Sequence, residues 1–471
     1  MLTVKRVTIN SYAVAPLVAV MFLTIASTAK AQSVDIDIDI AFDKSQQSRV
    51  VSDYLHEGDV VIPKASDTTQ TQPLPMRVQA HMDFFQRYTG NASENQAIRF
   101  YREAKSSINV DGGETAAVLE SGNRHIVTRI VPGSTRPIQV ASLGDALQQS
   151  ELDLLRNPGD PLTIPALFNR ANVSEGEKWD APKKALGSFL AVDRVMKNNV
   201  KILLKSIENR KAKIYISGKV QADVDDVKTS IELTGMLLAD LSDGSISSLR
   251  LDLREQRVQG QLAPGFFGRT KIVTRVSSAE PIKQLSTPTI KQLTSGRKVQ
   301  QRLKWVSDAG RFQLQYDPSW RLIASENEAA ILRYLNQGEL MAQCSVVRLP
   351  SRPADNPLTL ESFKKEVATI VAADKDAKLE SAEQLKSRSG LNVLEIQVSG
   401  VVEDVPLNWM YFHVSNHQGR CVTFVFTLEE ELAPEVRPAA RKLVSNLKFL
   451  LQKSSRKSQA NRAPESSRQV R

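Results

Sequence analysis

The stretch "ISSLRLDLREQRVQGQL" (residues 246–262) alternates apolar and polar side chains through its first half. Leu249, Leu251 and Leu253 fall on one side of an extended chain, and the charged residues next to them fall on the other. An alternation of period two is typical of a strand that packs one face on a core and leaves the other in water. The stretch therefore predicts an antiparallel strand with one buried face.

The preceding sequence repeats this pattern. Strand-length runs occupy residues 200–207, 211–224 and 226–241, and "LSDGS" (241–245) is a good turn sequence between the last of them and the opening stretch. Strands joined by short turns pair with their sequence neighbours. Residues 200–262 are therefore predicted to form an antiparallel meander.

Shorter strands and helices are predicted upstream of the meander. The proline-containing segment 65–75 predicts a loop, β-type runs recur between residues 76 and 131, and apolar stripes of helical spacing follow at 150–155 and 180–196. Residues 32–276 are therefore predicted to form a β-rich antiparallel domain with a few helices.

A second domain is predicted after a linker. Residues 277–301 lose the alternation and gain Pro, Ser, Thr and Lys, which is typical of a connecting segment. Residues 302–452 then combine strand-length runs with amphipathic helices at 360–373 and 434–447. The predicted fold class of the whole chain is α+β.

This second domain resembles the PsbP-like family, which is named for an extrinsic subunit of photosystem II. The resemblance rests on "GRFQLQYDPSW" (310–320), "LTLESFKKEVATIV" (358–371), "GRCVTFVF" (419–426) and "VSNLKFL" (444–450). It implies an α/β/α sandwich with an antiparallel sheet. The family has no common catalytic site, so no functional residue is carried over.

The first domain is faintly similar to the half-barrels of lipoprotein carriers, although no motif supports this likeness. In those proteins a curved antiparallel sheet and covering helices hold an acyl chain. The likeness implies a carrier of an apolar ligand. A sheet with one wet face and an ordinary core is the alternative.

The first 31 residues have the pattern of a secretory signal. Lys5 and Arg6 precede an apolar core at 13–26, and "AKA" (29–31) suits cleavage before Gln32. The core is shorter than the roughly 20 residues that span a bilayer, although an uncleaved anchor is the alternative. We predict export to the periplasm or the extracellular space, and no transmembrane segment in the mature chain.

Positive charge is concentrated at the two ends of the chain. The formal net charge is +10. The signal segment has three cations and no acid, and residues 453–471 have six cations and one acid, so the body between them is nearly neutral. The tail is predicted to be disordered, and it lacks aromatic residues that could stack on bases. The tail suits attraction to an anionic polymer or to lipid head groups of the envelope, and a solvated terminus without function is the alternative. For the protein as a whole the expected partner is an envelope protein, an anionic polymer or lipid, and no nucleic acid is expected.

Two cysteines, Cys344 and Cys421, fall in predicted strands of the second domain. Export to an oxidising compartment would allow a disulfide between them. Two buried free thiols are the alternative, and the sequence does not decide between them.

The acidic stretch "VDIDIDIAFD" (34–43) places Asp35, Asp37 and Asp39 on alternate positions. Same-face residues of a strand lie about 7 Å apart, so the outer two carboxylates are about 14 Å apart. Calcium binds its oxygens at roughly 2.3–2.6 Å, so one ion cannot gather all three along an extended strand. We predict a wet strand face and no metal site.

Sequence motifs for catalysis are missing. There is no G-x-S-x-G, G-x-G-x-x-G, phosphate loop or C-x-x-C. "HEGDV" (56–60) has Val60 where a zinc-protease helix would have its second histidine, and the pair His413 and His417 flanks a predicted turn. We assign no catalytic, cofactor-binding or metal-binding residue.

The sequence thus predicts an exported, non-catalytic protein that binds a partner or belongs to the cell envelope. A carrier of a lipid-like ligand and a hydrolase acting outside the cytoplasm are the two alternatives.

Overall fold

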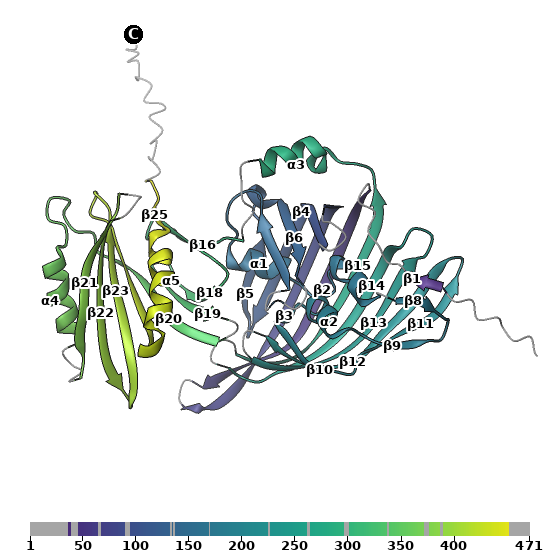
Figure 1. Cartoon of the computed structure of the whole chain (residues 1–471), viewed down its shortest axis with the longest axis horizontal. Helices are drawn as coiled ribbons and strands as arrows, with labels where there is room; N and C mark the ends of the chain where they lie inside the picture. Colours follow the sequence, from purple (N-terminus) through teal and green to yellow (C-terminus); the bar gives the residue numbers. More distant parts are fainter. Residues whose placement is uncertain are drawn as a thin grey trace, which may run out of the picture.

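A large curved antiparallel sheet dominates the computed structural model (Figure 1). It has 13 strands, in the order β7-β6-β4-β3-β2-β15-β14-β13-β12-β11-β9, with β5 on β4 and β10 on β12. The structure describes residues 36–38 and 46–451, apart from 65–66, 90–94, 132–133, 135–136, 169, 225–226, 261–263, 296–300, 337–338, 372–375 and 387–389. The strands of the sheet are β2 (Gln47–Lys64), β3 (Asp67–Tyr88), β4 (Asn95–Val110), β5 (Gly113–Val118), β6 (His125–Ile130), β7 (Ile138–Ser142), β9 (Lys178–Asp180), β10 (Arg194–Asn198), β11 (Lys201–Glu208), β12 (Lys211–Val224), β13 (Val227–Asp240), β14 (Ser245–Arg257) and β15 (Gly265–Ala279).

The predicted antiparallel meander is confirmed as β11 to β14 and continues into β15. Leu249, Leu251 and Leu253 of β14 are buried, as their alternation predicts. The neighbours of Leu249 in the adjacent strands are Leu237 and Thr274. The pairs β12–β13 and β14–β15 keep an unbroken register, which places every second residue of each strand on the same face of the sheet.

The inner face of the sheet is covered by the chain's own residues 149–192. This segment contains α1 (Gln149–Leu155), the short 3₁₀ turns η2 (Pro161–Thr163) and η3 (Pro165–Leu167), and α2 (Lys183–Phe189). Leu186 and Phe189 of α2 join one buried cluster with Leu233 and Leu251 of the sheet. Figure 1 shows α1 and α2 within the curve of the sheet.

The C-terminal part contains a 7-stranded antiparallel sheet in the order β18-β19-β20-β24-β23-β22-β21 and a 3-stranded sheet in the order β16-β17-β25. One helix packs on each face of the larger sheet, α4 over Ile396 and Val398 and α5 over Phe412 and Val414. The elements are β16 (Leu303–Ser307), β17 (Phe312–Tyr316), β18 (Trp320–Ser325), β19 (Ala329–Asn336), β20 (Glu339–Leu349), α4 (Leu360–Val371), β21 (Lys378–Lys386), β22 (Asn392–Val402), β23 (Val405–Ser415), β24 (Cys421–Glu429), α5 (Ala433–Ser445) and β25 (Leu447–Phe449).

The predicted α+β class, with its α/β/α sandwich, is wrong. The protein is mostly β-structure built from large antiparallel sheets. Strand runs that look short in the sequence join into strands of up to 22 residues, whereas the longest helix among the described residues has 13. The described part of the chain therefore has far more strand than helix, and its helices do not form complete layers.

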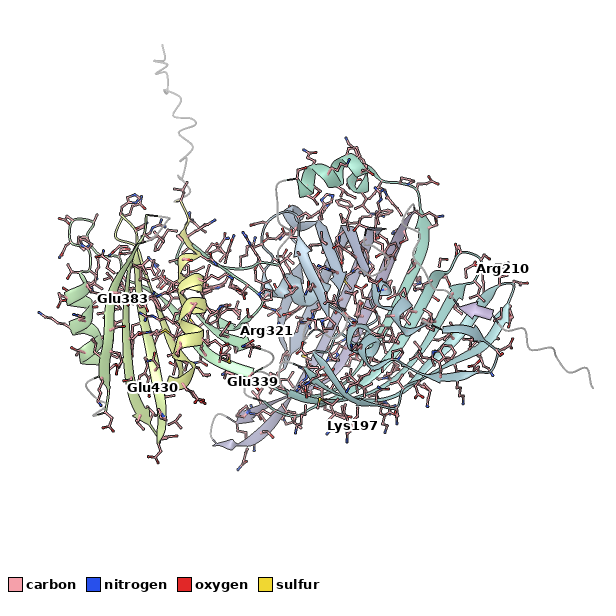
Figure 2. The ribbon with its side chains drawn as sticks, viewed as in Figure 1. Lys197, Arg210, Arg321, Glu339, Glu383 and Glu430 are labelled. Atoms are coloured by element: carbon pink, nitrogen blue, oxygen red, sulfur yellow. The ribbon has the colours of Figure 1, made fainter. Side chains whose placement is uncertain are left out.

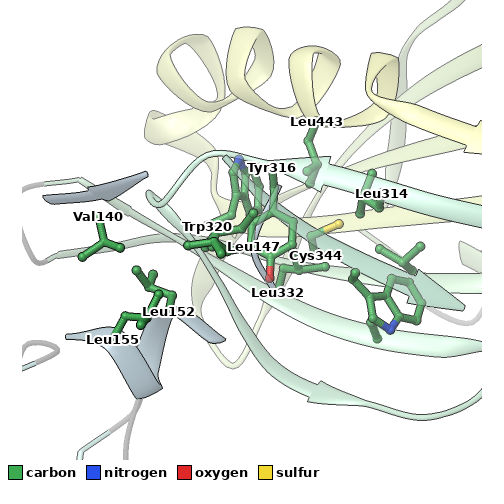
Figure 3. Close-up of a cluster of buried hydrophobic side chains, with 14 of the residues drawn as sticks. Val140, Leu147, Leu152, Leu155, Leu314, Tyr316, Trp320, Leu332, Cys344 and Leu443 are labelled. Atoms are coloured by element: carbon green, nitrogen blue, oxygen red, sulfur yellow. The ribbon is translucent and has the colours of Figure 1, made fainter. Parts of the chain in front are cut away.

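Both parts of the chain contribute to one hydrophobic core. Val140, Leu147 and Leu152 from the first part belong to the same buried cluster as Tyr316 and Trp320 from the second (Figure 3). A parallel bridge joins Leu147 to Leu303. Arg321, labelled near this junction in Figure 2, lies 3.8 Å from the Asp153 carboxylate.

Residues 277–301 include the end of β15, the turn η4 (Lys283–Leu285) and helix α3 (Thr287–Thr294). Leu285 is fully buried with Ile98, Val127 and Leu143 of the large sheet region. The segment between the two parts is thus anchored on the large sheet over part of its length.

The acidic stretch lies mostly outside the described residues. Only Ile36–Ile38 is described, as the short strand β1, which pairs with β8 (Arg170–Val173). Asp35 and Asp39 lie outside the described part, as do the predicted signal segment and the tail. Within the described residues, no helix is both long and apolar enough to cross a membrane.

Candidate binding surface

The outer face of the large sheet, turned away from residues 149–192, carries an excess of cations. On β12 to β15, alternate residues point to this face while their sequence neighbours are buried in the core. The cations that these strands place on the outer face are Lys211, Lys213, Lys219, Lys228, Arg250, Arg254, Arg269, Lys271 and Arg275, and the carboxylates on this face are Asp223, Glu232, Asp240 and Asp252.

Strand register brings four of these cations together on β14 and β15. Arg254 lies directly opposite Arg269, and Lys271 lies opposite Asp252. Arg250 has Met236 on one side and Val273 on the other. We call Arg250, Arg254, Arg269 and Lys271 the basic patch. Like charges directly opposite each other destabilise a sheet, and Glu232 opposite Arg254 and Glu57 opposite Arg269 offset only part of this repulsion.

Only part of the basic patch is neutralised. Arg269 donates a 2.6 Å hydrogen bond from Nε to Asp252 Oδ1. The Arg269 hydrogen bond is the main cause that lowers the pKa of Asp252, against a smaller effect of burial. Arg250, Arg254 and Lys271 have no ion-pair partner among the described residues. On its other side Arg254 lies directly opposite Glu232, and Lys271 and Arg254 both act on the Asp252 carboxylate. The patch therefore presents an excess of positive charge to solvent that neighbouring carboxylates offset only in part.

The histidines lie in different environments. On the outer face, His81 Nδ1 is 2.8 Å from Asp53 Oδ1, and its Nε2 is 3.9 Å from Glu103. His56 stacks on Phe266 at 4.5 Å between ring centroids. His413 is buried and His417 is exposed in a turn, so the structure does not present them as one site. In the described part of the chain, no three His, Cys, Asp or Glu residues are grouped so that they could hold a metal.

A buried ion pair lies beneath the inner face. Arg99 of β4 donates bidentate hydrogen bonds of 2.7 and 2.6 Å to Asp160, whose carboxylate also accepts from the backbone N–H of Leu162 in η2. Burial alone would lower the pKa of Arg99, but the Asp160 carboxylate outweighs it and the pKa is raised. The guanidinium also stacks over Phe84 at 4.7 Å. The pair attaches the inner segment to the sheet through both terminal nitrogens of Arg99 and both carboxylate oxygens of Asp160.

A cavity of about 150 Å³ opens beside this region, lined by Ser48, Tyr88, Pro161, Ile246 and Val276 among others. Pockets for drug-sized ligands usually have roughly 300–1,000 Å³. Leu186 and Phe189 fill the inner face beyond it. An acyl chain on this face would have to displace them, so the arrangement does not favour the carrier alternative.

Both cysteines are free thiols in the structure and both are buried. Cys344 lies opposite Phe426, and Cys421 lies opposite Leu349, on the same pair of strands. The two cysteines are thus offset by five residues, or about 16 Å along the strand. A disulfide requires Cα atoms within roughly 7 Å, so this register leaves the thiols unbonded.

His413 is buried beneath α4 without a hydrogen-bond partner for either ring nitrogen. Its ring lies 5.8 Å from that of Phe363. Burial, helped by Arg352 and opposed by Glu366, lowers its pKa to about 4. The neutral imidazole is therefore the form that the fold accommodates.

This burial predicts that the protein loses stability as the pH falls from 6.5 to 4. In that range the unfolded state binds a proton on His413 that the folded state does not, so the free energy of unfolding rises with pH and reaches its full value above pH 6.5. The expected change is on the order of 2–3 kcal/mol. Urea unfolding of a His413→Leu variant should show a flatter pH dependence across this range. His417→Gln, at the exposed histidine, is the control, and an equal change in both variants would contradict the prediction.

Comparison with known proteins gives no family. No protein-family model and no curated protein matches the chain. Among solved structures, cyanobacterial PsbP from Synechocystis sp. PCC 6803 is 18% identical over 33% of this chain and 96% of its own, with a TM-score of 0.26. A lipovitellin structure is 8% identical over 52% of this chain and 27% of its own (TM-score 0.29). The immunity protein TplEi of Pseudomonas aeruginosa is 10% identical over 54% and 96% (TM-score 0.21). The PsbP match is a weak resemblance of fold, and no function is inferred from these scores.

Proposed function

We propose that the protein is an exported, non-catalytic binding protein whose outer sheet face binds anionic groups presented in an array. Phosphate or carboxylate groups of an envelope component are the expected ligands. The observation that carries this proposal is the basic patch, in which Arg254 faces Arg269 and three of the four cations have no ion-pair partner among the described residues. The signal-like N-terminus supports export.

An array of anions suits this surface for a physical reason. Neighbouring strands lie about 4.8 Å apart and alternate residues about 7 Å apart, so the patch presents cations on a lattice of these spacings. A bound anion between Arg254 and Arg269 would remove their mutual repulsion as well as form new charge-assisted hydrogen bonds. Arginine also presents a planar fork of donors that fits oxyanions.

The proposal predicts that the purified protein binds long-chain polyphosphate in a salt-dependent way. Replacing Arg250, Arg254 and Lys271 by glutamine should weaken this binding. By analogy with flexible nucleic acid strands, where each neutralised phosphate contributes about 0.7 to the slope of log affinity against log salt, the slope should fall by about 2. Fluorescence titration at several salt concentrations measures both quantities.

The control variant removes the same charge elsewhere, by Lys291→Gln, Lys365→Gln and Lys378→Gln. These side chains are exposed and lie on α3, α4 and β21. This variant should keep the slope of the unmodified protein, apart from a small effect of net charge. Equal losses in the two variants would show that binding depends on total charge, and would overturn the role of the patch.

A further inference from the structure

Two large apolar side chains are exposed at one end of the outer face. Phe267 of β15 is 63% exposed and Val258, just after β14, is 57% exposed. Phe266, the neighbour of Phe267, points to the other face, where it is 7% exposed and stacks on His56. The aromatic ring of Phe267 has no ring partner among the described residues. Phe267 and Val258 are thus exposed to solvent and do not contribute to the core beneath the sheet.

These apolar side chains adjoin the basic patch. Phe267 lies opposite Gln256, two residues along the strands from the Arg254–Arg269 pair. The backbone N–H of Val258 donates to the carbonyl of Lys228, an exposed cation of β13. Apolar and cationic side chains therefore share one end of one face.

We propose that this end of the outer face docks on an anionic lipid bilayer, with Phe267 and Val258 entering the interface and the basic patch contacting the headgroup phosphates. This inference rests on the proposed function and names the source of the anions. A soluble polyanion would use the cations alone and leave the two apolar side chains in water. A bilayer uses both, because its surface is anionic and its interior begins just beneath the headgroups.

The acidic residues nearest this end are compatible with docking. Glu57 lies opposite Arg269 and is bound to Arg77 at 3.3 Å. Asp59 lies opposite Phe267 on β2 and is partly buried. Both belong to β2, whereas Val258 and Arg254 lie on the β14 side of Phe267. On that side Glu232 lies opposite Arg254, and Asp223, opposite Lys228, is bound to Arg194. The contact is thus expected along β14 and β15.

The test compares vesicles of phosphatidylcholine with vesicles that contain 30% phosphatidylglycerol. The protein should sediment with the anionic vesicles and not with the neutral ones. The double variant Phe267→Ser and Val258→Ser should lose at least tenfold in vesicle affinity while it keeps its affinity for polyphosphate. A Phe267→Trp variant should show a blue shift of its fluorescence on adding anionic vesicles, whereas Val347→Trp, on the distant β20, should not.

The matched control removes two other exposed apolar side chains, by Ile370→Ser and Val118→Ser, which are 63% and 62% exposed. It should bind vesicles like the unmodified protein. Polyphosphate binding without vesicle binding would overturn the bilayer and leave the proposed function intact. Failure to bind either probe would overturn both. Unchanged vesicle binding by the Phe267→Ser and Val258→Ser variant would overturn the role of these two side chains.

Discussion

The Arg99→Met variant is expected to lose about 3–5 kcal/mol of unfolding free energy, because it leaves the Asp160 carboxylate buried without its cation. Arg99 is 1% exposed and Asp160 7%. Methionine retains most of the volume of the side chain, so the loss reports the charge rather than a cavity. The urea midpoint of unfolding measures the effect, provided that the m-value is unchanged.

An exposed pair gives the matched comparison. Arg194 also donates two hydrogen bonds to one carboxylate, that of Asp223, but its side chain is 65% exposed. Arg194→Met should therefore cost less than about 1 kcal/mol. The double variant Arg99→Met and Asp160→Asn should be less destabilised than the sum of its single variants, since removing both charges leaves neither unpaired. Similar losses for Arg99→Met and Arg194→Met would contradict the importance of burial.

The Glu395→Gln variant has the second largest expected effect, a loss of about 3 kcal/mol. Glu395 has no exposed side-chain surface, and it accepts hydrogen bonds from Arg437 at 2.7 Å and Arg441 at 2.6 Å. These arginines are one turn apart on α5, so a single carboxylate attaches the helix to β22 through two charge-assisted bonds. Such bonds are worth roughly 1.5–3 kcal/mol each, and glutamine keeps at most a neutral acceptor.

Glu383 provides an internal control for Glu395. Its carboxylate accepts from the same two arginines, at 2.8 and 2.9 Å, and it lies directly opposite Glu395 in the sheet. Its side chain is 44% exposed, so Glu383→Gln should cost about 1 kcal/mol or less. In thermal or urea unfolding, Glu395→Gln should lose more stability than Glu383→Gln. The reverse order would contradict the importance of burial for this carboxylate.

Local alternation predicted the sheet but not the length of its strands. The alternation of Leu249, Leu251 and Leu253 identifies β14 and its neighbours. In contrast, Pro73 and Pro75 predicted a loop at 65–75, yet they lie inside β3, opposite Val61 and Asp59 of β2. Pairing of β3 with β4 begins only at Met76, so the prolines lie where one side of β3 has no ladder to complete. A proline on a locally unpaired edge does not break a strand, and the sequence alone does not reveal where the edge is.

The sequence overestimated the amount of helix relative to strand for a related reason. The helix predicted at 180–196 shrinks to Lys183–Phe189, and residues 194–198 form β10 instead. Val195 is buried in the inner cluster with α2. A short apolar run suits a helix face and a buried strand equally, so the tertiary packing decides.

The net charge of the chain body does not reveal the candidate binding surface. The body is nearly neutral because acids elsewhere offset its cations, and the total does not record which face each residue occupies. Arg250 and Arg254 alternate visibly with leucines in β14, so their exposure follows from the sequence. Their position opposite Val273 and Arg269 depends on the register with β15, which is set across a turn and was not predictable from either strand alone.

The backbone bridge between Leu147 and Leu303 helps to fix the orientation of the C-terminal sheet relative to the large sheet. The backbone N–H of Lys304 donates to the carbonyl of Leu147, and its ammonium, 6% exposed, holds Glu120 at 3.0 Å and Asp145 at 3.1 Å. With the core shared across this junction, the 7-stranded sheet cannot turn freely relative to the large one. A bilayer that binds the outer face of the large sheet would therefore also determine the orientation of the C-terminal sheet and its distance from the bilayer surface.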